Sequence, residues 1–95
     1  VDIVTLANNH TMDYQEAGLE ETIATLDQAG IQHVGAGRNV KDARRPDIIE
    51  VKGQRIAYLG YYSADFEIAS ETRAGSNYAE EKRIAEDIQA LRKQV

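Results

Sequence analysis

The stretch that decides the fold is residues 1–13, VDIVTLANNHTMD. Its first seven residues are aliphatic and β-branched for the most part, which is typical of a buried strand. A polar cluster follows at residues 8–13, and an apolar pattern with helical spacing begins directly after it. This order predicts the front half of a βαβ unit, with residues 31–34 as the second, parallel strand.

A first helix is expected to begin near Tyr14 and to end at Gly30. Asp13, with Glu16 three residues later, fits a capping box at its start. Gly30 fits the left-handed residue that commonly follows a helix. One face of this helix is apolar and carries Leu19, Ile23 and Leu26.

The middle of the chain predicts shorter elements. Residues 35–37, GAG, are expected to form a flexible turn, because a valine at position 40 breaks the dinucleotide-binding pattern G-x-G-x-x-G. Residues 39–45 fit one helical turn that Pro46 stops. A β-hairpin is expected from residues 47–52 and 55–62, with its turn at residues 53–54.

The last third predicts a long loop at residues 63–76 and a second helix that runs to the end of the chain. Asn77 and Glu80 fit a capping box for this helix. Its apolar face carries Ile84, Ile88, Leu91 and Val95. His33, inside the second strand, is expected to be a packed strand residue.

The expected element order is β-α-β-β-β-α, an α/β fold with a mixed β-sheet and flanking helices. The chain of 95 residues has 11 basic and 16 acidic residues and a net charge of −5, so nucleic acid is not an expected partner. It has no cysteine, which excludes disulfides and thiolate metal sites. No signal-peptide pattern and no apolar run of roughly 18 residues is present, so a soluble segment without an anchor is expected.

The polar cluster at residues 8–13 is the candidate site. It follows the carboxyl end of a strand and precedes a helix, which is where open α/β sheets bind ligands. An asparagine oxygen can bind a hard cation, and a histidine can bind metal or transfer a proton when a carboxylate orients it. His10 and Asp13 are spaced to touch. The alternatives are that Asp13 is only a helix cap, that Asn8 and Asn9 are turn residues, and that His10 is solvated.

A second candidate is the basic group of Arg38, Arg44 and Arg45. These side chains could face an anionic ligand. The alternative is that they form a solvated surface.

Three stretches resemble one known family. Residues 2–14, DIVTLANNHTMDY, residues 29–39, AGIQHVGAGRN, and residues 43–46, ARRP, are similar to the bacterial capsule synthesis family called CapA or PgsA, which acts in poly-γ-glutamate biosynthesis. That family is similar to the calcineurin-like metallophosphoesterases, whose fold is a β-sandwich flanked by helices with a two-metal site at strand ends. The resemblance therefore implies a partial metallophosphoesterase-like β-sandwich and a metal-dependent phosphoesterase or hydrolase activity in the full-length protein.

The resemblance also implies residue roles. Asn9 would be a metal ligand, and His10 would stabilise the phosphoryl transition state or protonate the leaving group. Asp13 would be the carboxylate that partners His10 in catalysis. Asn8 and Arg38 are assigned to substrate binding. The chain departs from the phosphoesterase pattern at Asn8, where glycine is usual, and at residue 11, where a threonine replaces an acid.

Two divalent metal ions are expected in the full domain, held mostly by segments before Val1 and after Val95. Residues 1–95 are therefore expected to be a single segment, a fragment of about the middle third of a CapA-like domain. On its own this segment is expected to be inactive and to bind no metal tightly.

Two functions follow from the resemblance. The full-length protein is either a phosphoester hydrolase or transferase of capsule biosynthesis, or a non-catalytic accessory subunit that binds the anionic polymer beside the synthase. Expected partners are other synthase subunits and a phosphoester or anionic polymer substrate, and exposed sheet edges predict self-association. By resemblance the full-length protein is extracytoplasmic and membrane-anchored.

Overall fold

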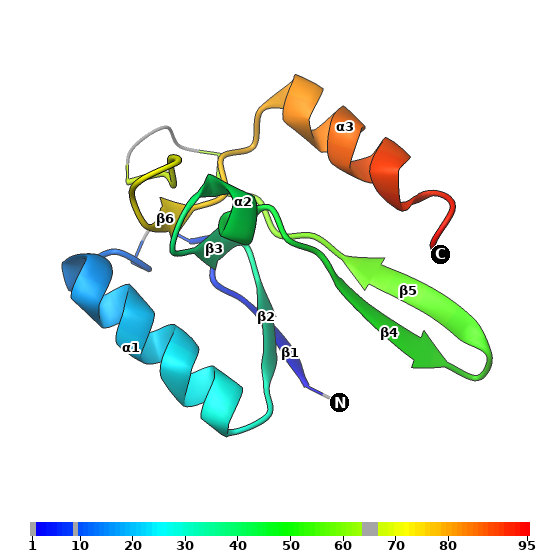
Figure 1. The fold of residues 1–95 in the computed structure, drawn as a ribbon, viewed down its shortest axis with the longest axis horizontal. Helices are drawn as coiled ribbons and strands as arrows, with labels where there is room; N and C mark the ends of the chain where they lie inside the picture. Colours follow the sequence, from blue (N-terminus) through cyan, green and yellow to red (C-terminus); the bar gives the residue numbers. More distant parts are fainter. Residues whose placement is uncertain (1, 9, 64–66) are drawn as a thin grey trace.

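The computed structural model describes residues 2–8, 10–63 and 67–95. The described helices are α1 (Gln15–Gln28), α2 (Val40–Ala43) and α3 (Glu81–Leu91). The described strands are β1 (Ile3–Thr5), β2 (Gln32–Val34), β3 (Ala36–Gly37), β4 (Asp47–Val51), β5 (Gln54–Tyr58) and β6 (Gly75–Ser76). Figure 1 shows α1 alongside β1 and β2, with the β4–β5 hairpin projecting away from them.

The strands run in both parallel and antiparallel pairs. β1 pairs with β2 in parallel, with Val4 opposite His33, whereas β3–β6 and β4–β5 are antiparallel. The α/β class with mixed strand directions is therefore confirmed. The strands of the described part form three two-stranded sheets rather than one continuous sheet. Gly35, at φ +93°, turns the chain between β2 and β3 and ends the first ladder there.

The core lies where α1 packs on β2 and β3. Leu19 and Ile23 of α1 are each 1% exposed, and Met12, Ala36 and Ala74 complete the buried cluster. The predicted apolar face of α1 is thus confirmed at these two positions. Burial of each of these two large side chains contributes about 1.5–3 kcal/mol to the stability of the fold.

The ends of α1 show one correct and one wrong prediction. Gly30 has φ +72° and its N–H donates to the carbonyl of Asp27, so the C-terminal glycine is confirmed. The capping box is wrong, because the cap position is Tyr14 rather than Asp13, and no side-chain hydrogen bond caps the helix there. Tyr14 has φ −106° and ψ 26°, which is not the extended backbone that a capping residue normally has, and Gln15 after it enters the helix at φ +63°.

His33 is a packed strand residue, as predicted. It is 5% exposed, and its Nε2 lies 2.8 Å from Oδ1 of Asp27 in the last turn of α1. This contact ties the end of the helix to the strand that follows it.

The capping box predicted for the second helix is also wrong. Asn77 is 1% exposed and lies four residues before α3, where its Nδ2 donates to the carbonyl of Gly60 at 2.8 Å and its N–H donates to the carbonyl of Gly35 at 2.8 Å. Tertiary hydrogen bonds thus occupy the residue that the local pattern assigns to a cap. The helix ends at Leu91 rather than at the end of the chain.

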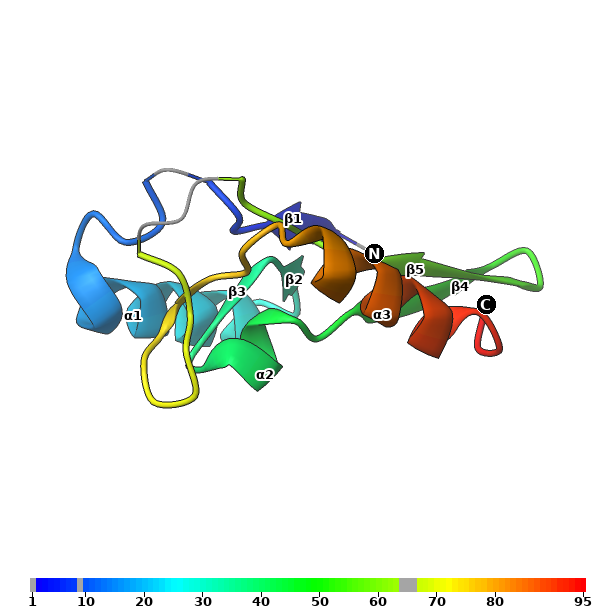
Figure 2. The ribbon, with the colours of Figure 1, turned by 90° about the horizontal axis from the view of Figure 1, so that it is seen from above.

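The hairpin is confirmed with shorter strands. Its register places Asp47 opposite Tyr58, so β5 ends at Tyr58 rather than at residue 62. The turn lies at Lys52 and Gly53, one residue earlier than predicted, and both have positive φ, as a type I′ turn requires. Figure 2 shows the tip of the hairpin extending beyond α3, with the end of the chain beside the hairpin.

The region predicted as a long loop contains a strand. β6 pairs with β3 through Ser76 opposite Ala36, and residues 64–66 of this region lie outside the described part. Neither β3 nor β6 is longer than two residues, which is too short for a pattern of alternation to predict. None of the helices in the described ranges is long and apolar enough to cross a membrane.

We expect Ile23→Ala to lower the free energy of unfolding by about 2–5 kcal/mol, because the side chain is buried on all sides and leaves a cavity. Ile88→Ala is the matched control, since Ile88 is 50% exposed on α3 and should cost less than about 1 kcal/mol. Urea denaturation followed by circular dichroism measures both. Equal losses would contradict the position of the core.

Candidate functional site

The polar cluster at residues 8–13 follows β1 after two intervening residues, and we call it the His10 loop. Nδ1 of His10 lies 2.8 Å from Oδ2 of Asp13, so the predicted contact between the two side chains is confirmed. Both side chains are open to solvent, at 73% and 52% exposure. Asp13 therefore orients the imidazole of His10 instead of capping α1.

The loop is held in place by one buried side chain and by two hydrogen bonds. Met12 is 5% exposed and belongs to the core cluster. The hydroxyl of Thr11 donates to the carbonyl of Leu6, and the N–H of His10 donates to Oδ1 of Asn8 at 2.9 Å. The two residues that follow His10, Thr11 and Met12, are thus held against the rest of the structure.

Asn8 and His10 share one hollow, whose volume is about 230 Å³. Leu6, Thr11, Tyr14 and the first turns of α1 line the rest of it. Asn9, predicted as a metal ligand, lies outside the described residues.

Arg38 lies at a different place. It lines a larger hollow of about 720 Å³ around α2, and this hollow shares no lining residue with the one beside His10. The structure therefore brings Asn8, His10 and Asp13 together and leaves Arg38 apart from them. We call this second cavity, lined within residues 38–46, the Arg38 hollow.

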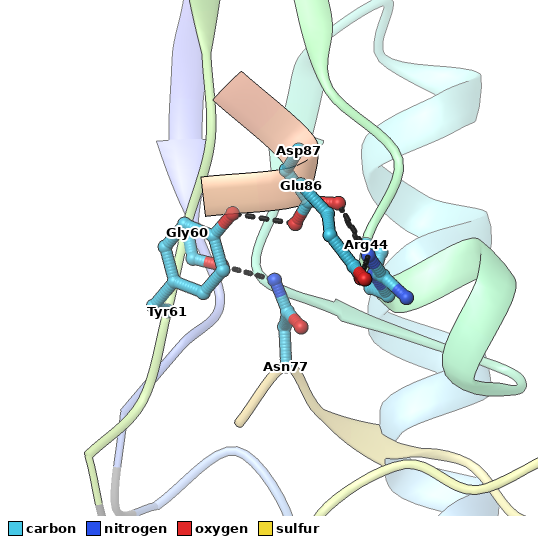
Figure 3. A network of polar contacts seen from close by, with 6 residues as sticks. All are labelled: Arg44, Gly60, Tyr61, Asn77, Glu86 and Asp87. Carbon is cyan, nitrogen blue, oxygen red and sulfur yellow. Dashed lines mark hydrogen bonds and ion pairs between the residues drawn. The ribbon is translucent and has the colours of Figure 1, made fainter. Parts of the chain in front are cut away.

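Sequence reasoning missed a polar network on one side of the Arg38 hollow, which we call the Asp87 cluster (Figure 3). Its members are Arg44, Tyr61, Glu86 and Asp87. Arg44 donates to Oδ1 of Asp87 through Nε at 3.2 Å and through Nη2 at 2.7 Å, and Nη2 lies 3.5 Å from Oε1 of Glu86. The hydroxyl of Tyr61 donates to Oδ2 of Asp87 at 2.6 Å.

The Asp87 cluster joins α2, the segment after β5, and α3. Burial, followed by the hydrogen bond to Asp87 and the charge of that carboxylate, raises the pKa of Tyr61 far above its ordinary value. The hydrogen bond to Asp87 raises the pKa of Arg44. Asp87 lies 26 residues from Tyr61 and 43 from Arg44, so no local pattern of the sequence could have predicted these pairs.

The described residues do not form a metal centre by themselves. No group of three or more His, Asp or Glu side chains among them is placed to hold a metal ion. In the His10 loop, Nδ1 of His10 is held by Asp13 and Oδ1 of Asn8 accepts from the backbone. What this arrangement can do on its own is bind or transfer a proton at Nε2 of His10, the ring nitrogen opposite Asp13.

Comparison with known proteins places this chain in a family. A family model described as bacterial capsule synthesis protein PGA_cap matches residues 1–95. The chain belongs to this family. The resemblance seen in the sequence to the CapA or PgsA family is thereby confirmed.

Individual relatives agree with this PGA_cap membership. The chain is 40% identical over 62 residues to the capsule biosynthesis protein CapA of Bacillus anthracis, covering 65% of this chain and 15% of the relative. It is 41% identical over 63 residues to a "probable polyglutamine synthesis accessory protein" of Mycobacterium tuberculosis, covering 66% of this chain and 17% of the relative. The PGA biosynthesis protein CapA of Bacillus subtilis is 35% identical over 60 residues, with 62% and 16% covered. The matched part thus spans less than a fifth of each relative.

The Asp87 cluster predicts a pH dependence of stability. Because the pKa of Tyr61 is raised in the folded protein, the unfolded phenol releases its proton first, at pH about 10. The stabilisation from Tyr61 is therefore complete below that pH and is lost as the pH rises above it. We expect the free energy of unfolding to fall more steeply from pH 9 to 11 in the natural protein than in Tyr61→Phe.

Tyr14→Phe is the matched control for this measurement, because Tyr14 is 84% exposed. Its curve of unfolding free energy against pH should run parallel to that of the natural protein. Parallel curves for Tyr61→Phe as well would contradict the role of the Asp87 cluster.

Proposed function

We propose that this chain carries the proton-transfer loop of a capsule biosynthesis protein that hydrolyses or transfers a phosphoester or a related bond. The observation that carries the proposal is the contact of 2.8 Å between His10 and Asp13 at the carboxyl end of β1. Membership of the PGA_cap family supplies the biosynthetic context.

The geometry suits a general acid. Asp13 accepts from Nδ1 when that nitrogen carries a proton, which makes Nε2 the ring nitrogen that can exchange a proton with a substrate. No hydrogen bond links Nε2 of His10 to another of the described residues. A protonated Nε2 could donate to the oxygen of a leaving group, with Asp13 stabilising the charged ring.

The surroundings of His10 favour access by a substrate. The side chain is 73% exposed and borders a hollow that also contains Asn8. Because Met12, two residues after His10, is buried in the core, the loop is positioned before a substrate arrives. In this proposal Nδ2 of Asn8 donates a hydrogen bond to a substrate oxygen, since its Oδ1 accepts from the N–H of His10.

The proposal includes divalent metal ions in the full-length protein. Such ions would neutralise the charge that develops on phosphoryl oxygens. Since the described residues do not hold a metal by themselves, we propose that other segments supply most of the ligands, with Asn9 contributing one. We also propose that the full-length protein is membrane-anchored, faces outward and contacts other subunits of the polymer synthase.

A second function has its own support. The name of the M. tuberculosis relative contains the words "accessory protein". In addition, Thr11 stands where the phosphoesterase pattern has an acidic residue. The hydroxyl of Thr11 donates to the carbonyl of Leu6, so this residue fixes the loop instead of binding a ligand. In this alternative the protein binds the polymer or the synthase without catalysis.

Catalysis predicts a strong effect of the His10–Asp13 pair. In the full-length protein with Mn²⁺ present, we expect His10→Ala to lower the rate of aryl phosphate hydrolysis by about 10²–10⁴-fold, since it removes the general acid. Asp13→Asn should lower the rate by about 10–100-fold, because the ring loses its orienting carboxylate. Steady-state release of the phenol measures both.

The second His–Asp pair of the chain gives the matched control. Asp27→Asn alters the contact with His33 on the other end of α1, and it should leave the rate of hydrolysis unchanged. Circular dichroism confirms that each variant is folded. If His10→Ala hydrolyses the substrate as fast as the natural protein, His10 has no part in the reaction, whereas no hydrolysis by the natural protein itself would favour the accessory subunit of the alternative.

We expect residues 1–95 alone to show negligible hydrolysis in the same assay, because their described side chains do not form a metal-binding group. The measurement uses the isolated chain with added Mn²⁺. A robust rate that disappears in His10→Ala would refute this expectation.

A further inference from the structure

Tyr14, directly after the His10 loop, exposes a large aromatic ring to solvent. It is 84% exposed, more than any other large apolar side chain in the described part of the chain. A single exposed aromatic residue is common on protein surfaces and indicates nothing by itself. Tyr14, however, lines the same hollow of about 230 Å³ as His10 and Asn8. We call this cavity the His10 hollow.

The backbone on both sides of Tyr14 is fixed. The N–H of Gln15 donates to the carbonyl of the buried Met12 at 2.9 Å, and the N–H of Gly18 donates to the carbonyl of Tyr14 at 3.2 Å. Gln15 has φ +63°, a left-handed conformation that non-glycine residues rarely adopt and that is found preferentially at functional sites. The point from which the ring projects is therefore set before any ligand binds.

Gly18, four residues later, makes room for the side chain of Tyr14. A Cβ added to Gly18 would lie 2.5 Å from the Cβ of Tyr14, which is closer than two such atoms can approach. Glycine inside a helix lowers its stability, so its presence in α1 needs a packing or functional reason. Here it allows Tyr14 to keep its position at the start of α1, and it lines the His10 hollow together with that residue.

A further hollow, which we call the α1 groove, adjoins the His10 hollow. It has a volume of about 560 Å³, and the two share Tyr14, Gly18 and Thr22 as lining residues. The hydroxyl of Thr22 donates to the carbonyl of Gly18 at 2.9 Å, so its hydrogen is already used within the helix. Hydrocarbon surface farther along the groove comes from Ala17 and Leu26. A ligand that begins in the His10 hollow can thus extend over an apolar surface beside the ring of Tyr14.

The charge around the α1 groove disfavours an anionic group. Neither hollow is lined by a lysine or an arginine, and Glu21 lines the groove. Arg73 lies 3.9 Å from Glu16 of the same helix, but neither of these residues lines either hollow. Because a carboxylate in the groove would meet the like charge of Glu21 without a compensating cation, the groove suits an uncharged group.

The role of His10 indicates which part of a substrate meets Tyr14. In the proposed reaction Nε2 of His10 donates its proton to the oxygen of the leaving group, so the leaving group lies in the His10 hollow. The rest of the leaving group then contacts the other lining residues, among which Tyr14 offers an aromatic ring. Aromatic rings pair favourably with other flat rings in offset-stacked or edge-to-face arrangements.

We propose that Tyr14 is a specificity-determining residue that stacks on the leaving group of the substrate and selects an uncharged leaving group with a flat ring. This inference rests on the proposed phosphoester reaction at His10 and names the class of leaving group for that reaction. His10 transfers the proton, whereas Tyr14 holds the departing group in place.

Calorimetric titration of the full-length protein, with Mn²⁺ present, tests the proposal with two phosphonates that cannot be hydrolysed. Phenylphosphonate carries the ring and ethylphosphonate lacks it. We expect Tyr14→Ala to weaken binding of phenylphosphonate about tenfold, as loss of an aromatic stacking partner implies, and binding of ethylphosphonate by less than about twofold. Tyr14→Phe keeps the ring and should bind both phosphonates like the natural protein.

Tyr58→Ala is the matched control. Tyr58 is 42% exposed on β5 and lines neither hollow, so its loss should change neither dissociation constant. Equal losses for the two phosphonates in Tyr14→Ala, or no loss for phenylphosphonate, would overturn the proposal.

A carboxylate on the ring tests the preference for an uncharged group. We expect 4-carboxyphenylphosphonate to bind more weakly than phenylphosphonate, and Glu21→Gln to reduce the difference between them. Binding of both with equal affinity by the natural protein would overturn this preference.

The hydrolysis assay with His10→Ala separates this inference from the proposed function. If hydrolysis depends on His10 but Tyr14→Ala binds phenylphosphonate normally, the proposed function stands and the role of Tyr14 is wrong. If the natural protein hydrolyses no aryl phosphate but shows the loss of ring binding in Tyr14→Ala, the reaction is wrong and the contact of Tyr14 with a ring stands.

Discussion

Burial of Met12 is the constraint on which the candidate site depends. Met12 lies in the core against the apolar face of α1, and the His10 loop must therefore cross the end of β1 close to the fold. The loop is consequently short and anchored, with His10 and Asp13 projecting into solvent on either side of the buried residue. A polar pair positioned in this way can meet a ligand without first paying the entropy of ordering a free loop.

The hydrogen bonds of the Asp87 cluster join α3 to parts of the fold with which it shares little hydrophobic packing. α3 buries only Leu91, and its position depends on Asp87, which accepts from both Tyr61 and Arg44. The same Arg44 lines the Arg38 hollow, so the contact that places α3 also removes one cation from that hollow. The His10 loop and the Asp87 cluster are thus positioned by different means, the loop by the buried Met12 and the cluster by hydrogen bonds.

Local patterns predicted those elements whose stability is local. The apolar spacing of α1, the left-handed Gly30 and the β4–β5 hairpin were all predictable, and so was the contact between residues three apart in the His10 loop. Both capping boxes failed because another contact occupies the side chain at the expected cap, a local one to His10 for Asp13 and a tertiary one for Asn77. Asn77, for example, is buried against Gly60 and cannot serve α3.

The sequence by itself determined the α/β class, the family and the identity of the candidate residues, because each is encoded in periodicity or in a short continuous motif. Only the tertiary structure decided that Arg38 lies apart from His10, that Asp87 joins three elements, and that β3 pairs with β6. Those features depend on contacts between residues distant in the chain. Such contacts form only when the apolar faces have packed, and no local spacing records them.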